Sequence, residues 1–165
     1  MSVAIFFASS TGNSEEIASK ISTALNGIEV FDLSGTKIEK MNDYDKLILG
    51  SSTWGDGELN DDWEDVWGDF CKLDLSNKTI ALFGLGDQES YSDEFCSAMG
   101  IIYEQIAKSG AKIIGFTSAD GYYHDSSKAQ IDDKFVGLAI DEDNQSDLTD
   151  ERINKWTNEI RENIL

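Results

Sequence analysis

The feature that most constrains the fold is an alternation of short apolar runs with amphipathic segments. Five runs have the length and composition of strands: Val3–Ala8, Ile28–Leu33, Lys46–Ser52, Thr79–Gly84 and Ala111–Thr117. Short runs rich in apolar residues are typical of strands buried on both faces of a parallel sheet. The sequence therefore predicts an α/β fold, a doubly wound open sheet of five parallel strands with helices on both faces.

Helices are predicted where apolar residues recur at helical spacing. They are expected around Ile17, Ile21 and Leu25, over the acidic segment Asn60–Phe70, around Phe95, Met99, Ile102 and Ile106, and around Ile153, Trp156 and Ile160. Thr149 is the predicted N-cap of the last helix, because Asp150 and Glu151 then fall in its first turn. Between the fifth strand and this helix, a polar segment over about 118–134 precedes a further strand piece, Phe135–Ile140.

Composition limits the class of protein and its partners. The 165 residues, with 13 Lys and Arg against 32 Asp and Glu, suit a single domain, 1–165, with a formal charge of −19. This charge argues against binding to nucleic acid or an anionic membrane and favours a partner protein with a basic surface. Cys71 and Cys96 lie far apart, no apolar run could span a bilayer, and no signal peptide is recognised. We therefore expect a reduced, cytoplasmic protein.

The segment after the first strand has the composition of a phosphate site. Hydroxyl groups, an amide and a glycine precede the helix, in the run Ser9, Ser10, Thr11, Gly12, Asn13 and Ser14. Backbone N–H groups at a helix N-terminus bind phosphate well, particularly with hydroxyls beside them. The motifs of P-loop nucleotide hydrolases and of dinucleotide-binding proteins are absent. A single terminal phosphate held by neutral donors fits this loop, and an ordinary serine-rich turn is the alternative.

Two further loops combine glycines with an aromatic residue. Thr53–Leu59 follows the third strand and contains Trp54, while Gly84–Tyr91 follows the fourth strand and ends in Tyr91. Ligands bind at the carboxyl ends of the strands in doubly wound sheets. Both aromatics could instead cover the core, but their place beside the phosphate-type loop favours a planar ring held between Trp54 and Tyr91.

These motifs, taken in order, resemble those of the long-chain bacterial flavodoxins. The resemblance extends to the polar stretch from Ser118 and to Asp141–Gln145, which resemble the insertion that splits the fifth strand in long-chain members. Ser52 departs from the family pattern, because many members have proline there. The resemblance implies strand order 2-1-3-4-5 and a noncovalently bound FMN. It also implies a low-potential one-electron carrier that works between the semiquinone and hydroquinone states and has no substrate of its own.

The expected FMN contacts lie in the three loops, and no metal site is predicted. They are Ser9, Ser10, Thr11, Gly12, Asn13, Ser14, Thr53, Trp54, Gly55, Asp56, Gly57, Gly84, Leu85, Gly86, Asp87 and Tyr91. The family also implies that the peptide between Gly55 and Asp56 turns its carbonyl toward the reduced ring. Nearby carboxylates, among them Glu58 and Asp62, should oppose formation of an anionic flavin, because like charges repel most strongly where water is excluded.

Other readings of the sequence lead to different functions. An FMN-dependent quinone or azo reductase on the same fold needs an open cavity over the flavin, which Tyr91 would cover. A phospho-acceptor signalling domain needs an acidic pair after the first strand, where this chain has hydroxyls. His124 is interpreted as a residue on the surface or on the side that faces a partner protein. Asp141–Asn144 is interpreted as a solvated acidic loop. The expected partners are an NADP-linked flavodoxin or ferredoxin reductase and a 2-oxoacid oxidoreductase, and the carrier is expected to be a monomer.

Overall fold

The structure, a computed structural model, describes residues 2–9, 12–54 and 57–165, with the backbone alone at Trp54. The main sheet contains β1 (Val3–Ala8), β2 (Glu29–Asp32), β3 (Lys46–Trp54), β5 (Thr79–Leu85), β6 (Lys112–Ile114) and β10 (Leu138–Ile140), with β4 (Glu58–Leu59) paired to the end of β3. The helices are α1 (Asn13–Ala24), α2 (Asp61–Phe70), α3 (Ser97–Lys108) and α4 (Thr149–Ile164). Short 3-10 turns cover Leu33–Gly35, Ile38–Asp43, Ser92–Glu94 and Ser146–Leu148.

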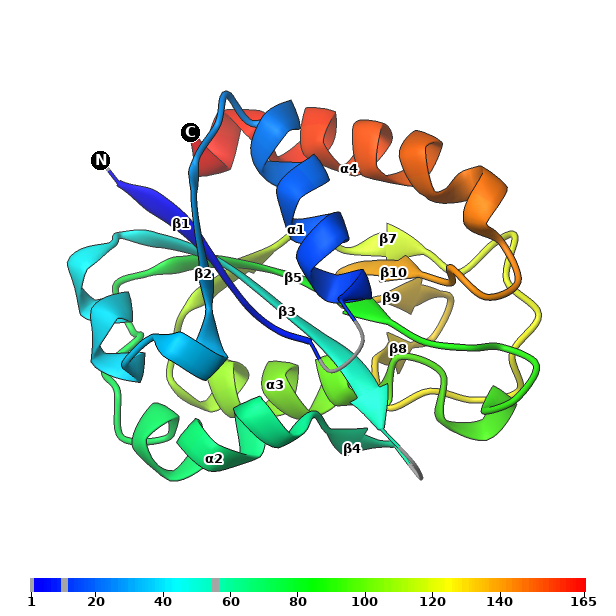
Figure 1. Ribbon diagram of the computed structural model, residues 1–165, viewed down its shortest axis with the longest axis horizontal. Helices are drawn as coiled ribbons and strands as arrows, with labels where there is room; N and C mark the ends of the chain where they lie inside the picture. Colours follow the sequence, from blue (N-terminus) through cyan, green and yellow to red (C-terminus); the bar gives the residue numbers. More distant parts are fainter. Residues whose placement is uncertain (1, 10–11, 55–56) are drawn as a thin grey trace.

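The sheet has the predicted parallel order. β1 lies between β2 and β3, β3 pairs with β5, and both β6 and β10 pair with β5 on its other side. The chain therefore runs outward in one direction from β1 to β2 and in the other from β3 to β5. Helices cover both faces, α1 and α4 on one side and α2 and α3 on the other (Figure 1). This confirms the predicted doubly wound fold.

Successive side chains along each strand point to opposite faces of the sheet, and this alternation produces two separate cores. In β1, Ala4 and Phe6 face the layer of α2 and α3, whereas Ile5 and Phe7 face the layer of α1 and α4. All four side chains are at most 2% exposed. Both sides of each central strand are thus buried, which explains why these strands are apolar runs in the sequence.

The fifth strand is divided into two pieces. The division agrees with the insertion that the family resemblance implied, but the strand predicted over 111–117 was too long, because β6 ends at Ile114 and Gly115, with φ +85°, turns the chain away from the sheet. The chain returns to the sheet only at β10, which continues the same edge against β5. Residues 115–137 between them contain β7 (Thr117–Ser118), β8 (Gln130–Ile131) and β9 (Lys134–Phe135), which form a small antiparallel sheet. The predicted strand piece over 135–140 is likewise divided, at Gly137.

The four predicted helices are present, with errors at two of their starts. Phe95, predicted in the third helix, precedes α3 and is extended, with φ −63° and ψ 119°. The apolar residues chosen for α4 are buried, but Thr149 is not an N-cap, because its φ of −58° and ψ of −51° are already helical. Its hydroxyl instead donates to the Glu142 carboxylate, which joins α4 to the preceding loop. In the described part of the chain, none of the helices has the length and apolar character needed to cross a bilayer.

Candidate functional site

Three of the predicted loops meet at one edge of the sheet. Ala8 of β1 is in register with Ser51 of β3, Ser51 is in register with Gly84 of β5, and Ser52 with Leu85. Because the strands are parallel, the segments that follow them leave the sheet side by side. The edge includes the point between β1 and β3 where the chain reverses its direction of winding, the usual ligand position in such sheets.

The loop after β1 presents a helix N-terminus with an unused hydroxyl. Gly12 adopts φ +89° as the residue before α1, and its N–H donates to Ser9 Oγ at 2.9 Å. Ser14, in the first turn, is 1% exposed, and among the described residues its Oγ has no hydrogen-bond partner. A buried hydroxyl without a partner is costly, so a ligand that accepts its hydrogen bond would be favoured here. The predicted contacts Ser10 and Thr11 lie outside the described residues.

The loop after β3 forms a hairpin with β4. Thr53 pairs with Leu59 and Trp54 with Glu58 in antiparallel register, and the Thr53 hydroxyl accepts a hydrogen bond from Ala98 N at 3.1 Å. This bond holds the end of β3 against the start of α3. The described residues do not include Gly55, Asp56 or the Trp54 side chain. The expected rotation of the peptide between Gly55 and Asp56, and the tryptophan of the expected aromatic pair, therefore lie outside them.

Gly57 has two reasons to be glycine. Its φ is +89°, and a Cβ added there would overlap the carboxylate of Glu94, whose Oε2 is buried. We expect Gly57→Ala to lower the free energy of unfolding by about 1–3 kcal/mol, from backbone strain and displacement of Glu94. Chemical denaturation measures the change. Gly35→Ala is the control, because no atom lies within 4 Å of its added Cβ, and an equal loss in both variants would contradict this account.

The loop after β5 packs closely on α3. A Cβ at Gly84 would lie 2.9 Å from Met99 Cβ, and one at Gly86 would lie 2.8 Å from the backbone N of Cys96. Close packing against α3 thus accounts for both glycines independently of any ligand. Tyr91, at the end of this loop, is 50% exposed. An aromatic ring this exposed, in a loop at this edge of the sheet, can stack on a planar ligand.

A buried polar network fixes this loop, and the sequence interpretation missed it. Asp141 is 0% exposed, and its carboxylate accepts from Gln88 N and Nε2 at 3.1 and 2.9 Å, and from Asn144 N and Nδ2 at 3.0 and 2.9 Å. Gln88 Nε2 also donates to Gln145 at 2.9 Å. The prediction of a solvated acidic loop was therefore wrong at Asp141. Its position directly after a buried strand, β10, beside the end of β5, was the available signal.

The Asp87 carboxylate shapes the loop that carries it. Its Oδ1 accepts hydrogen bonds from Glu89 N at 3.0 Å, Ser90 N at 2.9 Å and Asn144 Nδ2 at 2.8 Å. Burial alone would raise the pKa of Asp87, but these hydrogen bonds outweigh it and leave the pKa below its usual value. Asp87 therefore stabilises its own loop through its ionised form.

The Asp87 contribution to stability should depend on pH. Because the folded-state pKa is lowered, the stabilisation is complete above the ordinary carboxylate pKa of about 4 and is lost as the pH falls through the folded value. We expect Asp87→Asn to be less stable than the unaltered protein at pH 7 and the difference to shrink below about pH 4. Urea unfolding across this pH range measures it. A difference that grows on acidification would contradict the assignment.

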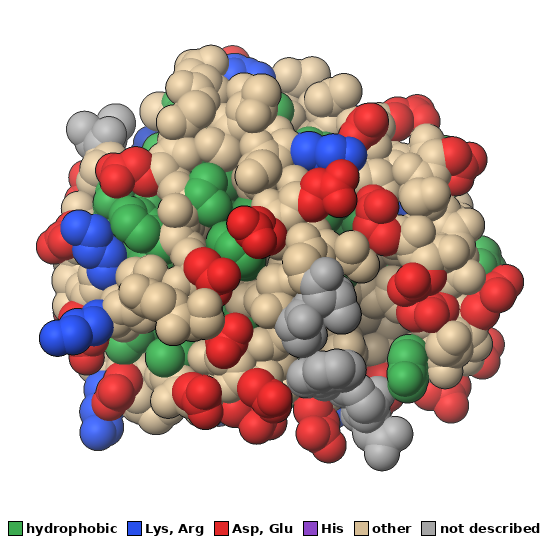
Figure 2. Space-filling view, viewed as in Figure 1, with side chains coloured by type: hydrophobic (Ala, Val, Ile, Leu, Met, Phe, Trp, Pro, Cys, Tyr) green, Lys and Arg blue, Asp and Glu red, His purple; other side chains and the backbone are tan. Residues whose placement is uncertain are grey.

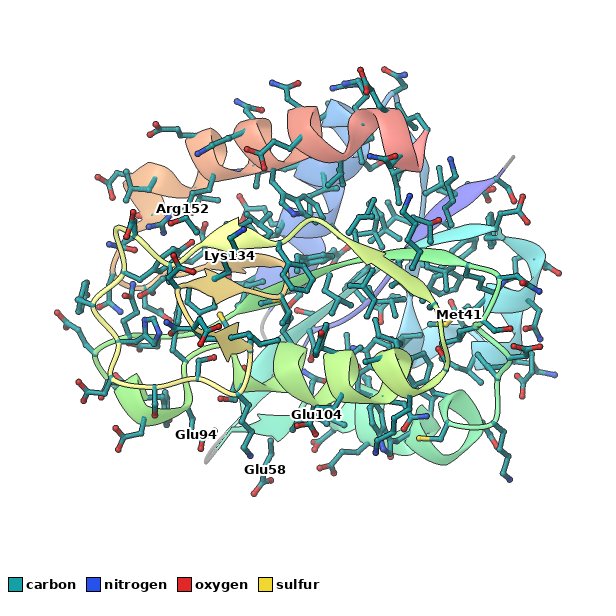
Figure 3. The ribbon with its side chains drawn as sticks, turned by 180° about the vertical axis from the view of Figure 1, so that it is seen from behind. Met41, Glu58, Glu94, Glu104, Lys134 and Arg152 are labelled. Atoms are coloured by element: carbon teal, nitrogen blue, oxygen red, sulfur yellow. The ribbon has the colours of Figure 1, made fainter. Side chains whose placement is uncertain are left out.

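Carboxylates surround the site. Burial, together with repulsion by Asp32, Asp65 and Asp61, raises the pKa of Asp62 in the first turn of α2. Figure 2 shows Asp and Glu side chains outnumbering Lys and Arg over the face that includes the β1 and β3 loops. Glu58 and Glu94 lie at the same end of the molecule (Figure 3). A ligand that gains negative charge at this edge would be destabilised by the surrounding field.

The insertion between β6 and β10 is hydrogen-bonded to the loop after β5 that ends in Tyr91, here called the Tyr91 loop. His124 packs within this part of the molecule. Ser92 O accepts from Asp125 N at 2.9 Å and from Ser126 N at 3.0 Å. His124 was interpreted as a surface residue, but it is half-buried, with its ring 5.1 Å from Phe95 and 5.2 Å from Phe135 between centroids. The histidine thus belongs to an aromatic cluster under the loop.

Burial raises the pKa of the Cys96 thiol, with a further contribution from the Asp141 charge. Cys96 is fully buried, whereas Cys71 is exposed, and both are free thiols. The neutral form of Cys96 is therefore strongly favoured, and a neutral buried thiol is unreactive.

Comparison with known proteins agrees with this arrangement. The model of the flavodoxin family matches residues 5–156. A flavodoxin from Picosynechococcus sp. is 48% identical over 162 residues, covering 96% of this chain and 95% of its own, and a flavodoxin from Helicobacter pylori is 48% identical over 159 residues, covering 96% of both. The structure of Fusobacterium nucleatum flavodoxin bound to flavin mononucleotide superposes with a TM-score of 0.94 at 31% identity, over 99% of both chains. The chain belongs to the flavodoxin family.

Proposed function

We propose that this protein is an electron carrier that binds FMN noncovalently at the edge formed by the β1, β3 and β5 loops. The cofactor accepts and donates single electrons, and the chain holds it, excludes water from it and sets the charge around it. The residues present fit this group, because this edge of the sheet offers a helix N-terminus for a phosphate and an exposed tyrosine for a planar ring.

The observation that carries the proposal is the Ser14 hydroxyl. It is buried and, among the described residues, unpartnered in the first turn of α1, directly beside the end of β1. A dianionic phosphate at this helix N-terminus would accept its hydrogen bond and be favoured by the helix dipole. The loop contains no lysine or arginine, so neutral donors would supply all of its recognition.

The remaining contacts are those that the family resemblance implies. Tyr91 would cover one face of the ring and Trp54 the other, while backbone groups of the β5 loop would hold its polar edge. The Asp87 carboxylate is already engaged within its loop, so its side chain would act through loop shape. The full set comprises Ser9, Ser10, Thr11, Gly12, Asn13, Ser14, Thr53, Trp54, Gly55, Asp56, Gly57, Gly84, Leu85, Gly86, Asp87 and Tyr91, within a single domain of residues 1–165.

Binding of FMN and of riboflavin to the FMN-free protein tests this proposal directly. The two ligands share the ring and differ in the phosphate, so a phosphate site predicts a large preference for FMN. Isothermal titration calorimetry should give at least about a hundredfold difference in Kd, corresponding to about 2.7 kcal/mol. Equal affinities would contradict a phosphate site at the α1 N-terminus.

Replacing Tyr91 with alanine should weaken FMN binding by about tenfold to a hundredfold, because stacking and the exclusion of water are both lost. Phe116→Ala is the matched control, since Phe116 is 37% exposed and follows β6, outside the three loops. We expect that variant to change the Kd by less than about threefold. Fluorescence quenching of the flavin measures both, and equal effects in the two variants would argue against a specific stack at Tyr91.

The partners of such a carrier are redox proteins. We propose that they present basic surfaces to the acidic edge, as an NADP-linked flavodoxin or ferredoxin reductase or a 2-oxoacid oxidoreductase would, and that the carrier is a cytoplasmic monomer. Encounters of this kind are small and electrostatically steered, so raising the ionic strength should slow association. Family membership favours the carrier over a quinone reductase on the same fold, and a negligible rate of NADH-dependent quinone reduction by the purified protein would distinguish the two.

A further inference from the structure

A second cleft lies between the insertion and α4, away from the β1 and β3 loops. It has a volume of about 470 Å³, within the range of roughly 300–1,000 Å³ typical of small-molecule sites. Its walls come from β7, β9 and β10 on one side and from α4 on the other. The cleft therefore exists because the fifth strand is interrupted. No residue of the loops after β1, β3 and β5 lines it.

The charge in this cleft is opposite to that of the molecule as a whole. Lys134, Arg152 and Lys155 line it, against two carboxylates, Asp120 and Glu159. The walls thus carry a net positive charge in a chain of formal charge −19 that has 13 basic residues. Figure 3 shows Lys134 and Arg152 on the two sides of this region, one from β9 and one near the start of α4.

These cations are not neutralised by ion pairs within the protein. In the part of the chain that the structure describes, the ion pairs involve Lys20, Lys40 and Lys128 but none of the three residues in the cleft. The Arg152 guanidinium donates one long hydrogen bond, from Nη2 to Gly121 O at 3.5 Å, and among described residues its Nη1 is buried without a partner. Arg152 therefore retains donors that an anion would satisfy.

Arg152 is also held in a fixed orientation. Its guanidinium lies 4.0 Å from the centroid of the Tyr122 ring, and the Tyr122 hydroxyl donates to Ala139 O at 2.5 Å. The indole of Trp156 is fixed in the same wall by its hydrogen bond to Gly115 O at 2.8 Å. A stacked arginine of this kind loses little conformational entropy when it binds a carboxylate or phosphate.

The lining also includes aromatic surface. Phe116 is 37% exposed at the cleft, and Tyr122 and Trp156 form part of its walls. We propose that this cleft binds a small planar anion, a molecule with an aromatic ring and one phosphate or carboxylate group. The ring would pack against Phe116, the exposed aromatic side chain of the cleft, while the anionic group pairs with Arg152 and the two lysines. The site is separate from the FMN site and does not depend on the proposed function.

Titration of the 15N-labelled protein, loaded with one equivalent of FMN, with phenyl phosphate tests the proposal. The Trp156 indole N–H should shift saturably, while the indoles of Trp63 and Trp67, both in α2, serve as references within the same spectrum. The flavin absorption should stay unchanged, which separates this site from the FMN site. The ionic strength is kept constant throughout the titration. A Trp156 signal that does not shift at the highest soluble concentration of phenyl phosphate would overturn the proposal.

Two related ligands distinguish the parts of the proposal. Inorganic phosphate lacks the ring and benzyl alcohol lacks the charge, so each should bind at least about tenfold more weakly than phenyl phosphate. Equal binding of inorganic phosphate would overturn the aromatic part, and equal binding of benzyl alcohol would overturn the anionic part.

Substitutions assign the site to particular residues. Arg152→Gln should weaken phenyl phosphate at least about tenfold, and Lys155→Gln by a smaller factor, as expected for lost charge-assisted hydrogen bonds. Lys72→Gln is the matched control, because it removes one positive charge from an exposed position outside the cleft. A thermal unfolding curve establishes that each variant is folded. Equal weakening by the control, or none in either cleft variant, would overturn the assignment.

Discussion

Replacing Asp141 with alanine is expected to lower the free energy of unfolding of the FMN-free protein by about 3–5 kcal/mol. The carboxylate is fully buried and accepts hydrogen bonds from both Gln88 and Asn144. Alanine would leave the backbone N–H groups of Gln88 and Asn144 without this acceptor, while their side-chain amides would keep only their bonds to Gln145 and Asp87. The lost hydrogen bonds would no longer compensate for removing these polar groups from water. Urea denaturation followed by far-ultraviolet circular dichroism measures the change.

The same substitution should also weaken FMN binding, because the network fixes the loop that ends in Tyr91. Asp143→Asn is the matched control, two residues away and exposed. Burial and repulsion by Asp87 and Asp141 raise the pKa of Asp143, so removing its charge should leave stability unchanged or slightly increased. If Asp141→Ala costs no more than Asp143→Asn, the network has no role in stability.

Ser14→Ala is expected to change cofactor affinity and protein stability in opposite directions. The variant loses one hydrogen bond to a charged phosphate, which predicts a rise in the FMN Kd of about tenfold to a hundredfold. In the FMN-free protein the hydroxyl is buried and has no partner among the described residues, so alanine should leave the stability unchanged or raise it slightly. Riboflavin affinity should change by less than about twofold, since riboflavin has no phosphate.

Ser19→Ala provides the control for this experiment, because Ser19 is exposed on the same helix. It should leave FMN and riboflavin affinity unchanged. A loss of FMN affinity in Ser14→Ala that is matched by an equal loss for riboflavin would place Ser14 beside the ring rather than the phosphate. A large loss of stability without FMN would show that its hydroxyl has a structural partner.

The fold was predictable because its signals are local. β1 begins and ends where its apolar run does, and β3 and β5 extend their runs by only one or two residues. Each of these strands is buried on both faces, so its composition alone marks it. The carboxyl ends of parallel strands meet at one edge, and this geometric rule is enough to predict that the loops after β1, β3 and β5 lie together.

What could not be predicted depends on contacts between distant segments. Asp141 is buried because β10 returns beside β5 and brings Gln88 to it, and its short-range sequence, rich in carboxylates, resembles a solvated loop. His124 packs against Phe95 and Phe135 only because the insertion folds under the Tyr91 loop. The early end of β6 similarly follows from a glycine in a left-handed conformation, Gly115, which an apolar run does not reveal.

Stepwise reduction of the purified protein, reconstituted with FMN, tests the central claim most directly. Anaerobic titration with a one-electron donor, followed by visible absorption, should show one bound flavin per chain and two resolved one-electron stages. The second stage should occur at a markedly lower potential than for free FMN, because the carboxylates around the site oppose added negative charge. A protein that takes up no FMN at micromolar concentration, or whose bound flavin is reduced at the potentials of the free cofactor, would contradict the account.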